Sequence, residues 1–178
     1  MLPETERLYL RQYTPDDFDG LYAILSDPVT MAHYPKPYDE AGTRRWLQWS
    51  FDNYKTYGFG LWAVILKETG TFLGDCGLTI QHIDGEYLPE IGYHIRRDYW
   101  RRGYGQEAAR AVRDWAFTHT DYPCLYSYMT AGNLASQATA ASMGMQKIKE
   151  YIDDHYEAAC VYAITRSEWE SRFQTVQP

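Results

Sequence analysis

Three apolar segments joined by two short turns constrain the fold of this chain more than any other feature. The segments Leu61–Lys67, Thr71–His82 and Glu86–Ile95 have the length and composition of β-strands. Glu68-Thr69-Gly70 and Asp84-Gly85 lie between them, and both are typical of hairpin turns. Because parallel strands need a crossover of about a dozen residues or more, connections this short predict an antiparallel meander.

Strand and helix signals alternate on both sides of the meander. The other expected strands are Arg7–Tyr13, Leu125–Met129, Gln146–Ile152 and Ala158–Thr165. Helices are expected from Thr14, from Glu40 to Tyr57, from about Gly103 to His119, and from Asn133 to about Met143. Gly58 and Gly144 follow two of these helices, where a left-handed glycine typically ends a helix. The order β-α-α-β-β-β-α-β-α-β-β predicts an α+β fold.

The composition argues for one ordinary globular domain over residues 1–178, since no repeat, low-complexity stretch or linker interrupts the chain. A formal net charge of -7 argues against a general nucleic-acid binder, because phosphate contacts need a broad basic surface. Such acidity is compatible with a cationic substrate, such as an amine. The longest apolar run, Leu61–Leu66, is too short to cross a bilayer.

The cysteines and the N-terminus bear on the compartment. Cys76, Cys124 and Cys160 are odd in number and far apart, which is typical of reduced, buried thiols. No Cys or His pair has the spacing of metal ligands, and MLPETERLYL lacks the apolar core of a signal peptide. We therefore expect a cytoplasmic protein without a metal and without a membrane partner.

A cluster of arginines precedes a Gly-x-Gly turn in this acidic chain. Residues 96–106 read RRDYWRRGYGQ and lie between an expected strand and an expected helix. A helix N-terminus presents unpaired N–H groups and a partial positive charge, and Gly103 and Gly105 let those amides approach a ligand closely. With Arg101 and Arg102 beside them, the turn predicts a phosphate site. The alternative is a plain turn with solvated arginines.

The turn matches neither common nucleotide motif. No Gly-Lys-Ser/Thr follows it, as a P-loop requires. A third glycine is missing, and a meander rather than a βαβ unit precedes it, unlike the dinucleotide-binding fingerprint. A nucleotide-binding protein of another class, which would prefer ATP or NAD, stays an alternative.

Two segments together resemble a known family. WRRGYGQEA, between the EIGYHI strand and an amphipathic helix, resembles the acetyl-CoA loop of the GCN5-related N-acetyltransferases (GNAT), and NLASQATAASMGM resembles the family's Asn-x-x-Ser … Gly-Phe segment. Tyr99-Trp100 and Trp169 resemble the branch of ribosomal-protein alanine acetyltransferases. The resemblance covers about residues 5–170 and implies a GNAT-like mixed, mostly antiparallel twisted sheet of about six to seven strands flanked by about four helices.

The resemblance also implies a reaction and a site. The reaction is acetyl transfer from acetyl-CoA to an amine of a small molecule or peptide. The implied cofactor-binding residues are Tyr93, His94 and Ile95 for the pantetheine arm, Arg101, Arg102, Gly103, Tyr104, Gly105 and Gln106 for the pyrophosphate, and Asn133 near the arm. Two positions depart from the family: Trp100 replaces a Gln or Arg, and Ala140 replaces a tyrosine that often serves as general acid.

Amine acetylation needs a base, because most amines are protonated at neutral pH. Glu90 is the first candidate, and it shares one face of its strand with Gly92 and His94. At Gly92 a bulge could open the strand. His94 is the second candidate base. The alternatives are a solvated carboxylate at Glu90 and a structural histidine at His94.

The acid that protonates the leaving thiolate is less constrained. Ser136 resembles a serine of the alanine-acetyltransferase branch, although serine near an Asn cap often makes only a local hydrogen bond. Tyr128 is another candidate, and a thiolate can also leave without an acid. The aromatic segments His33–Tyr38 and Tyr57–Gly60 are candidates for the acceptor pocket. A non-catalytic acyl-CoA-binding module of the same fold and a homodimer paired through a strand edge stay open.

Overall fold

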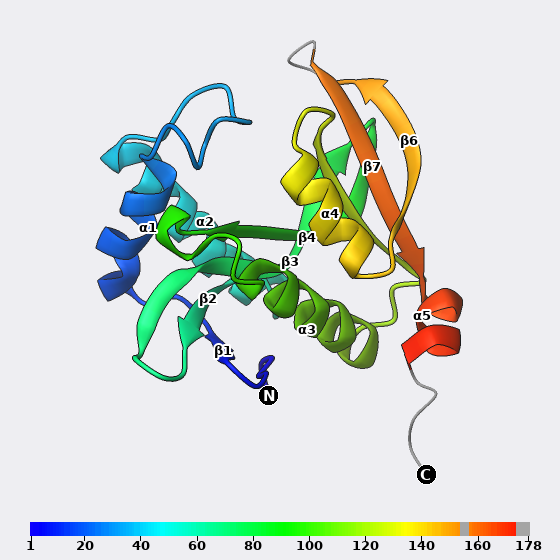
Figure 1. Ribbon diagram of the computed structural model, residues 1–178, viewed down its shortest axis with the longest axis horizontal. Helices are drawn as coiled ribbons and strands as arrows, with labels where there is room; N and C mark the ends of the chain where they lie inside the picture. The colour runs from blue at the N-terminus through cyan, green and yellow to red at the C-terminus, as the bar shows by residue number, and fades with distance from the viewer. Residues whose placement is uncertain (154–156, 174–178) are drawn as a thin grey trace.

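The computed structural model describes residues 1–153 and 157–173, and in this part of the chain seven strands form a single sheet (Figure 1). The strands are β1 (Leu8–Arg11), β2 (Leu61–Leu66), β3 (Thr71–Ile83), β4 (Glu86–Ile95), β5 (Cys124–Thr130), β6 (Gln146–Ile152) and β7 (Ala158–Thr165). The helices are α1 (Phe18–Leu25), α2 (Glu40–Tyr57), α3 (Tyr104–His119), α4 (Leu134–Ser142) and α5 (Arg166–Phe173). The predicted α+β fold and its order of elements are confirmed.

Helix α5 was not expected from the sequence. Trp169 is its buried apolar residue, and one such residue does not make the periodic apolar pattern that predicts a helix. Its start does carry a capping box, since the Glu168 carboxylate accepts from the backbone N–H and hydroxyl of Thr165. The single domain over residues 1–178 stays a prediction, and residues 154–156 and 174–178 lie outside the described residues.

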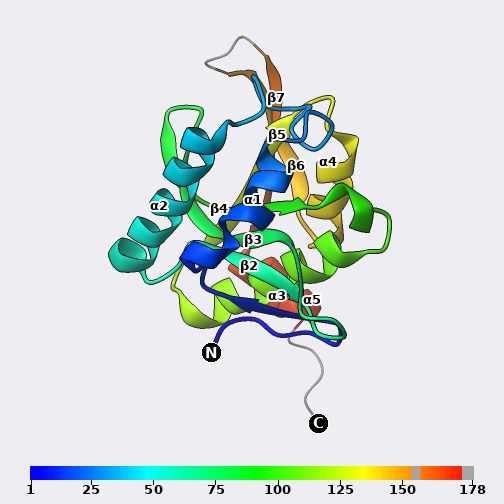
Figure 2. The same ribbon diagram turned by 90° about the vertical axis from the view of Figure 1, so that its left-hand side faces the viewer.

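Strand β2 is apolar at every position because helices cover both faces of the sheet. Trp62, Val64 and Leu66 belong to the core beneath α3, whereas residues 61, 63 and 65 belong to the core beneath α1 and α2. All six residues of β2 are buried. Figure 2 shows α1 and α2 on one side of the sheet, which leaves α3 and α4 for the other.

The antiparallel meander is confirmed in its turns and its register. Strand β1 pairs with β2, β2 with β3 and β3 with β4, all antiparallel. Asp84 and Gly85 both have positive φ, 46° and 87°, as a two-residue hairpin turn requires. The pairing of β3 with β4 runs without a shift from Gly74 opposite Ile95 to the turn, so the bulge considered at Gly92 is absent from this ladder.

Strand β4 also borders β5, and this contact decides where a ligand can enter. The two strands are parallel and pair only at Glu90 and Tyr126 in the described residues. Beyond that pair they separate, so the edge of residues 91–95 that faces β5 has no strand partner there. Strands β5, β7 and β6 continue as an antiparallel unit on the side of the molecule away from α1 and α2 (Figure 1).

Among the residues that the structure describes, no helix is both long and apolar enough to span a membrane.

Candidate active site

A cleft of about 1440 Å³ opens where β4 and β5 separate. It is bordered by both strands, by the loop before α3, by the start of α4 and by the segment between α1 and α2. The predicted site residues that line it are Glu90, Tyr93, His94, Ile95, Arg101, Gly103, Tyr104, Gly105, Gln106, Asn133 and Ser136. Arg102 is not among the residues that line the cleft, and its guanidinium lies 5.3 Å from the centre of the Tyr99 ring.

The loop before α3 has the backbone of an anion-binding helix start. Gly103 precedes the helix with a φ of 81°, a left-handed conformation that glycine adopts without strain. Arg101 also has a positive φ, 60°. The first N–H groups of any helix lack partners within it, and here they belong to cleft-lining residues, Tyr104, Gly105 and Gln106. The loop therefore offers backbone donors and a helix dipole to a phosphate.

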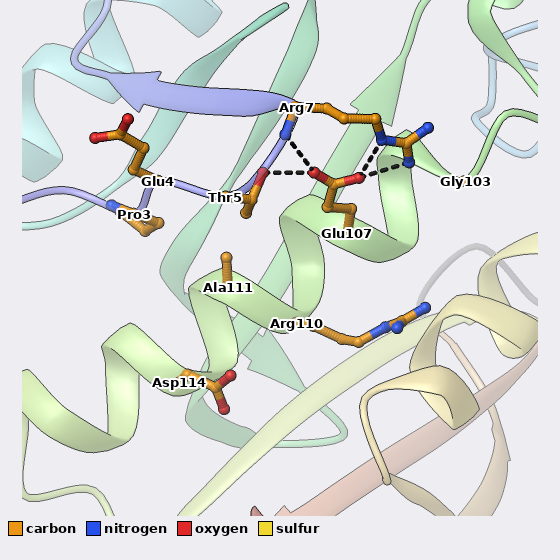
Figure 3. A pocket seen from close by; sticks show the side chains of 9 residues that line it. All are labelled: Pro3, Glu4, Thr5, Arg7, Gly103, Glu107, Arg110, Ala111 and Asp114. Carbon is orange, nitrogen blue, oxygen red and sulfur yellow. Dashed lines mark hydrogen bonds and ion pairs between the residues drawn. The ribbon is translucent and has the colours of Figure 1, made fainter. Parts of the chain in front are cut away.

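An ion pair from Arg7, the residue just before β1, fixes this helix start in place (Figure 3). The Arg7 guanidinium lies 2.5 Å from the Glu107 carboxylate, donates to the Arg102 carbonyl at 3.0 Å, and stacks 4.5 Å from the centre of the Tyr104 ring. Thr5 donates a further hydrogen bond to Glu107. Arg7 thus neutralises an acid beside the predicted phosphate site and holds both sides of the glycine turn.

The same residues border a separate pocket of about 540 Å³ between the N-terminal segment and α3 (Figure 3). Four of its charged side chains have ion-pair partners: Glu107 pairs with Arg7, Glu4 with Lys67, and Asp114 with the neighbouring Arg113. Arg110, the fifth, donates to the Gln106 side chain at 3.3 Å.

Trp100 occupies the position where the family usually has Gln or Arg, and it anchors the loop. Its indole Nε1 donates to the Ile95 carbonyl at 2.6 Å. Ile95 is the last residue of β4, so this bond joins the end of the strand to the loop. Trp100 thus holds the loop against the end of β4 through this hydrogen bond.

Glu90 is a buried acid at the point where the two strands separate. Its side chain lies on the cleft, is 7% exposed, and accepts a hydrogen bond from Thr79 at 3.2 Å. Burial raises its pKa to about 7, partly offset by the Thr79 hydrogen bond and the nearby His94. Gly92 leaves room for it, since a Cβ there would lie 3.0 Å from a Glu90 carboxylate oxygen. Glu90 is therefore a cleft carboxyl near half-ionisation at neutral pH.

His94 is held by hydrogen bonds at both ring nitrogens. Nδ1 lies 2.8 Å from the Asp75 carboxylate, and Nε2 lies 2.7 Å from the Tyr34 hydroxyl. Asp75 is fully buried on β3 and also accepts from the Tyr13 hydroxyl at 2.7 Å. Burial lowers the pKa of His94, but the charge and hydrogen bond of Asp75 outweigh it and the net pKa is raised.

Ser136 meets Tyr93 across the cleft. The Tyr93 hydroxyl lies 2.9 Å from both the Ser136 carbonyl and its hydroxyl. Asn133 caps α4, because its side chain accepts from the Ser136 backbone N–H at 3.1 Å. Tyr128 lines the cleft from β5, and burial together with the Glu90 charge raises its pKa to about 12. The structure brings together all the candidate acids weighed from the sequence.

Aromatic rings wall the end of the cleft next to His94. The rings form a row in the order Tyr34, Tyr38, Trp46 and Trp49, and all four line the cleft. The centres of successive rings in this row lie 6.3, 5.5 and 5.8 Å apart. Of the two aromatic segments proposed for an acceptor pocket, the first lines the cleft. Phe59 of the second is instead buried in the core beneath α3.

The sequence alone did not identify the residues that hydrogen-bond to His94 or to its partner Asp75. Tyr13 and Asp75 were not singled out, and Tyr34 only as one member of an aromatic segment. Asp75 did carry a signal, because a lone acid inside an apolar strand is seldom buried without partners. Its partners come from other segments, so the sequence could not identify them.

Comparison with known proteins then places the chain in a family. The model of the "Acetyltransferase (GNAT) domain" matches residues 7–146. This chain belongs to the GNAT acetyltransferases. The family resemblance is confirmed, while the branch stays a prediction.

Two relatives extend over most of the chain. The uncharacterized protein YkkB of Bacillus subtilis is 38% identical over 82% of this chain and 85% of its own. The uncharacterized N-acetyltransferase p20 of Bacillus licheniformis is 30% identical over 80% of this chain and 81% of its own. The chain is accordingly an acetyltransferase by family.

Solved structures share the fold. An acetyltransferase from Agrobacterium tumefaciens is 30% identical, with a TM-score of 0.79 over 90% of this chain and 92% of that one. A spermidine N-acetyltransferase from Vibrio cholerae, in complex with CoA and spermine, has a TM-score of 0.74 at 14% identity, covering 93% of this chain and 99% of that one. At 14% identity, the comparison with the spermidine N-acetyltransferase shows that the two proteins share a fold.

Proposed function

We propose that this acetyltransferase moves an acetyl group from acetyl-CoA directly to a primary amine of a small molecule or a protein N-terminus. One observation carries the proposal: a single cleft joins the phosphate-type loop before α3 to the buried carboxyl of Glu90. Such a cleft can hold a long phosphorylated thioester with its acyl end beside a base.

The described residues suit CoA along its length. The amides of Tyr104, Gly105 and Gln106 would bind the pyrophosphate at the start of α3, with Arg101 adding charge. On the edge of residues 91–95 that no strand covers, the Ile91 and Ile95 carbonyls accept from Ser127 and Trp100, and the backbone of Tyr93 between them would offer hydrogen bonds to the pantetheine arm. Asn133, at the start of α4, would border the arm on its other side. Among the described residues no cluster of His, Cys, Asp and Glu could hold a metal ion.

Glu90 would act as the general base, directly or through a water. A base works best when its pKa lies near the working pH, and the pKa of Glu90 is about 7. Direct transfer is favoured over a cysteinyl intermediate, because the three cysteines do not line the cleft: Cys76 and Cys160 are buried, and Cys124 bonds within β5. Attack by the neutral amine would then form the tetrahedral intermediate in one step.

Ser136 would protonate or solvate the leaving thiolate. Its hydroxyl shares a hydrogen bond with Tyr93, which gives the pair a proton that either oxygen can donate. Burial raises the pKa of Tyr93, so its phenol stays protonated and available as a donor at neutral pH. An acetyl-CoA kinetic comparison of Ser136→Ala with Tyr93→Phe would show which hydroxyl matters more.

The amine class is supported by the acceptor end of the cleft. Aromatic faces next to a carboxyl attract ammonium groups, and Tyr34, Tyr38 and Trp46 line the cleft with Glu90. A protein of the same fold is solved with CoA and spermine, a polyamine. The cytoplasmic location and the homodimer stay predictions.

Ligand-dependent thermal unfolding tests the proposal. Acetyl-CoA, CoA, ATP and NAD would be added separately to the purified protein, followed by a screen of amines for acetylation. Saturation at about 100 times the Kd adds roughly 2.7 kcal/mol to the free energy of unfolding, a measurable shift. Stabilisation by acetyl-CoA and CoA alone is expected. Equal or greater stabilisation by ATP or NAD would contradict the cofactor assignment.

A non-catalytic CoA-binding module is distinguished by variants. We expect Glu90→Gln and Ser136→Ala to lower turnover while CoA affinity, measured by calorimetry, stays unchanged. A protein that binds CoA but acetylates no amine in the screen would favour the non-catalytic alternative.

A further inference from the structure

A chain of hydrogen bonds runs from the core to the acceptor end of the cleft. The Tyr13 hydroxyl donates to Asp75 at 2.7 Å, Asp75 binds His94 Nδ1 at 2.8 Å, and His94 Nε2 lies 2.7 Å from the Tyr34 hydroxyl. These residues come from four separate segments: the turn after β1, strands β3 and β4, and the connection from α1 to α2. Tyr34 and His94 line the cleft, so the chain ends where an amine would bind.

The acceptor Asp75 determines which nitrogen of His94 carries the proton. An ionised carboxylate only accepts hydrogen bonds, and one oxygen of Asp75 receives both the ring Nδ1 and the backbone N–H of His94. A proton on Nδ1 leaves Nε2 of the neutral ring as an acceptor. The Tyr34 hydroxyl must then donate to Nε2, which leaves its oxygen lone pairs for another donor.

The charged neighbours of His94 favour proton uptake by the ring. Asp75 faces it from β3 and Glu90 faces it from β4, and both are acids. Tyr34 faces it from the connection between α1 and α2, while α2 contributes the neutral ring of Trp46 at 5.4 Å. An imidazolium here would stay bonded to the Asp75 carboxylate, and the charge of Glu90 would stabilise it further.

We propose that Tyr34 is a second catalytic proton acceptor, positioned and deprotonated by His94 and Asp75. The inference rests on the proposed function. In the tetrahedral intermediate the attached nitrogen is positively charged. Its N–H bond breaks as an O–H bond forms at Tyr34, while the original Tyr34 O–H bond breaks and an N–H bond forms at Nε2 of His94. The positive charge moves from the intermediate to the imidazolium, which Asp75 stabilises.

Glu90 and Tyr34 thereby divide the two protons that the amine must lose. Glu90 removes the first proton, which turns the ammonium into a nucleophile. Tyr34 and His94 remove the second from the intermediate. Each group must be in its basic form at the start of the reaction, so turnover depends on two deprotonated groups in the enzyme.

The tautomer of His94 is tested without any acceptor. Protein labelled with ¹⁵N at its five histidines would be examined by NMR at pH 8, with the His94→Gln variant to assign the signal. We expect a proton on Nδ1 and none on Nε2. The opposite tautomer would overturn the relay, because a protonated Nε2 cannot take a proton from Tyr34. This result is independent of whether any amine is acetylated.

The relay itself is tested by Tyr34→Phe, which keeps the ring against its neighbours and removes only the hydroxyl. With the best amine of the screen, kcat is expected to fall about 100-fold or more. The acid side of the wild-type profile of log kcat against pH should approach a slope of 2, and that of the variant a slope of 1. Affinity for CoA should be unchanged by calorimetry.

Tyr22→Phe is the matched control, since Tyr22 lies on α1 and stacks on Phe18 outside the cleft. It should keep the wild-type rate and profile. A Tyr34→Phe enzyme that matches the wild type in kcat, or in the slope of the profile, would overturn the proposal. If the wild type acetylates no amine, the proposed function fails, and the NMR experiment alone then decides the arrangement of the relay.

Discussion

At the scale of single residues, the properties of the cleft arise from two acids that are buried away from water, Glu90 and Asp75. Glu90 and Asp75 are both buried on neighbouring strands, but their partners differ. Asp75 is bound by His94 and Tyr13, whereas Glu90 has one hydrogen bond, from Thr79. Burial with few partners favours the neutral form of an acid and so raises its pKa. A carboxylate with a raised pKa takes up a proton more readily, as a general base must.

Glu90→Gln is expected to lower kcat by about 100-fold or more while it raises the stability of the protein at pH 8. The folded pKa of about 7 lies above the ordinary value of 4.5, so ionisation of Glu90 opposes folding. The wild type loses this stability as pH rises from about 4.5 to about 7, by about 3 kcal/mol in total. The variant should lack this loss.

Urea unfolding of both proteins at pH 4.5 and pH 8 measures the effect. The two should differ little at pH 4.5 and most at pH 8, with the variant the more stable. Thr79→Val, which removes the partner of Glu90, is the companion variant. An equal difference at both pH values would show that Glu90 is not buried in the way the structure describes.

At the scale of elements, the start of α3 depends on the segment that leads into β1. The left-handed backbone at Gly103 and Arg101 is held from outside by Arg7, which contacts the Glu107 carboxylate, the Arg102 carbonyl and the Tyr104 ring. The loop segment has four arginines of its own, yet the arginine that holds it in place is distant in the sequence.

Arg7→Ala is expected to weaken CoA binding by about 3- to 10-fold, because Glu107 loses its ion-pair partner beside the proposed phosphate site, and the Arg102 carbonyl and the Tyr104 ring each lose a contact. Calorimetry with CoA at low salt measures the change. Lys67→Ala is the matched control, since Lys67 forms an ion pair with Glu4 nearby but does not contact the loop. A similar loss of affinity in both variants would indicate a general charge effect.

Gly103→Ala tests the backbone of the same element. A Cβ there would meet only the Arg7 guanidinium, at 3.5 Å, so strain at a φ of 81° is the main consequence. We expect a loss of about 1 to 2 kcal/mol in stability and weaker CoA binding. Gly20→Ala, which would crowd the Phe72 ring, is a control for stability loss away from the cleft. If CoA affinity falls equally in both, the loop has no special role.

At the scale of the whole molecule, the site exists because the sheet divides. Residues of β4 come from the half that carries α1 and α2, whereas Ser136 and Asn133 come from the helix that precedes β6 and β7. Within each half the strands form antiparallel ladders, whereas in the described residues the two halves of the sheet share a single strand pair, Glu90 and Tyr126. A ligand in the cleft would bridge the two halves.

Hydrogen exchange measured with and without CoA tests this bridging. We expect slower exchange at residues 91–95, 101–106 and 133–139 together, because a bound ligand would contact both sides of the division. Helix α5, which packs against β7, should change little. Protection confined to the loop before α3 would mean that CoA does not enter between the strands.

The local sequence determined most of the elements, because their signals lie within a few residues. The turn at Asp84-Gly85 forms the meander, Gly58 ends α2 with a φ of 77°, and Asn133 caps α4, all as expected. The Gly-x-Gly turn and the Asn-x-x-Ser segment likewise indicated the family and the position of the cleft.

Tertiary structure alone decided the electrostatics of the site. Whether the Glu90 carboxyl is solvated or buried depends on the tertiary packing around it, and the hydrogen-bond partners of the His94 ring come from residues 34 and 75. Turns and caps arise from backbone geometry within a few residues, so a sequence can display them. A pKa or a relay arises from burial and from charges that are distant along the chain, and only the folded molecule brings these together.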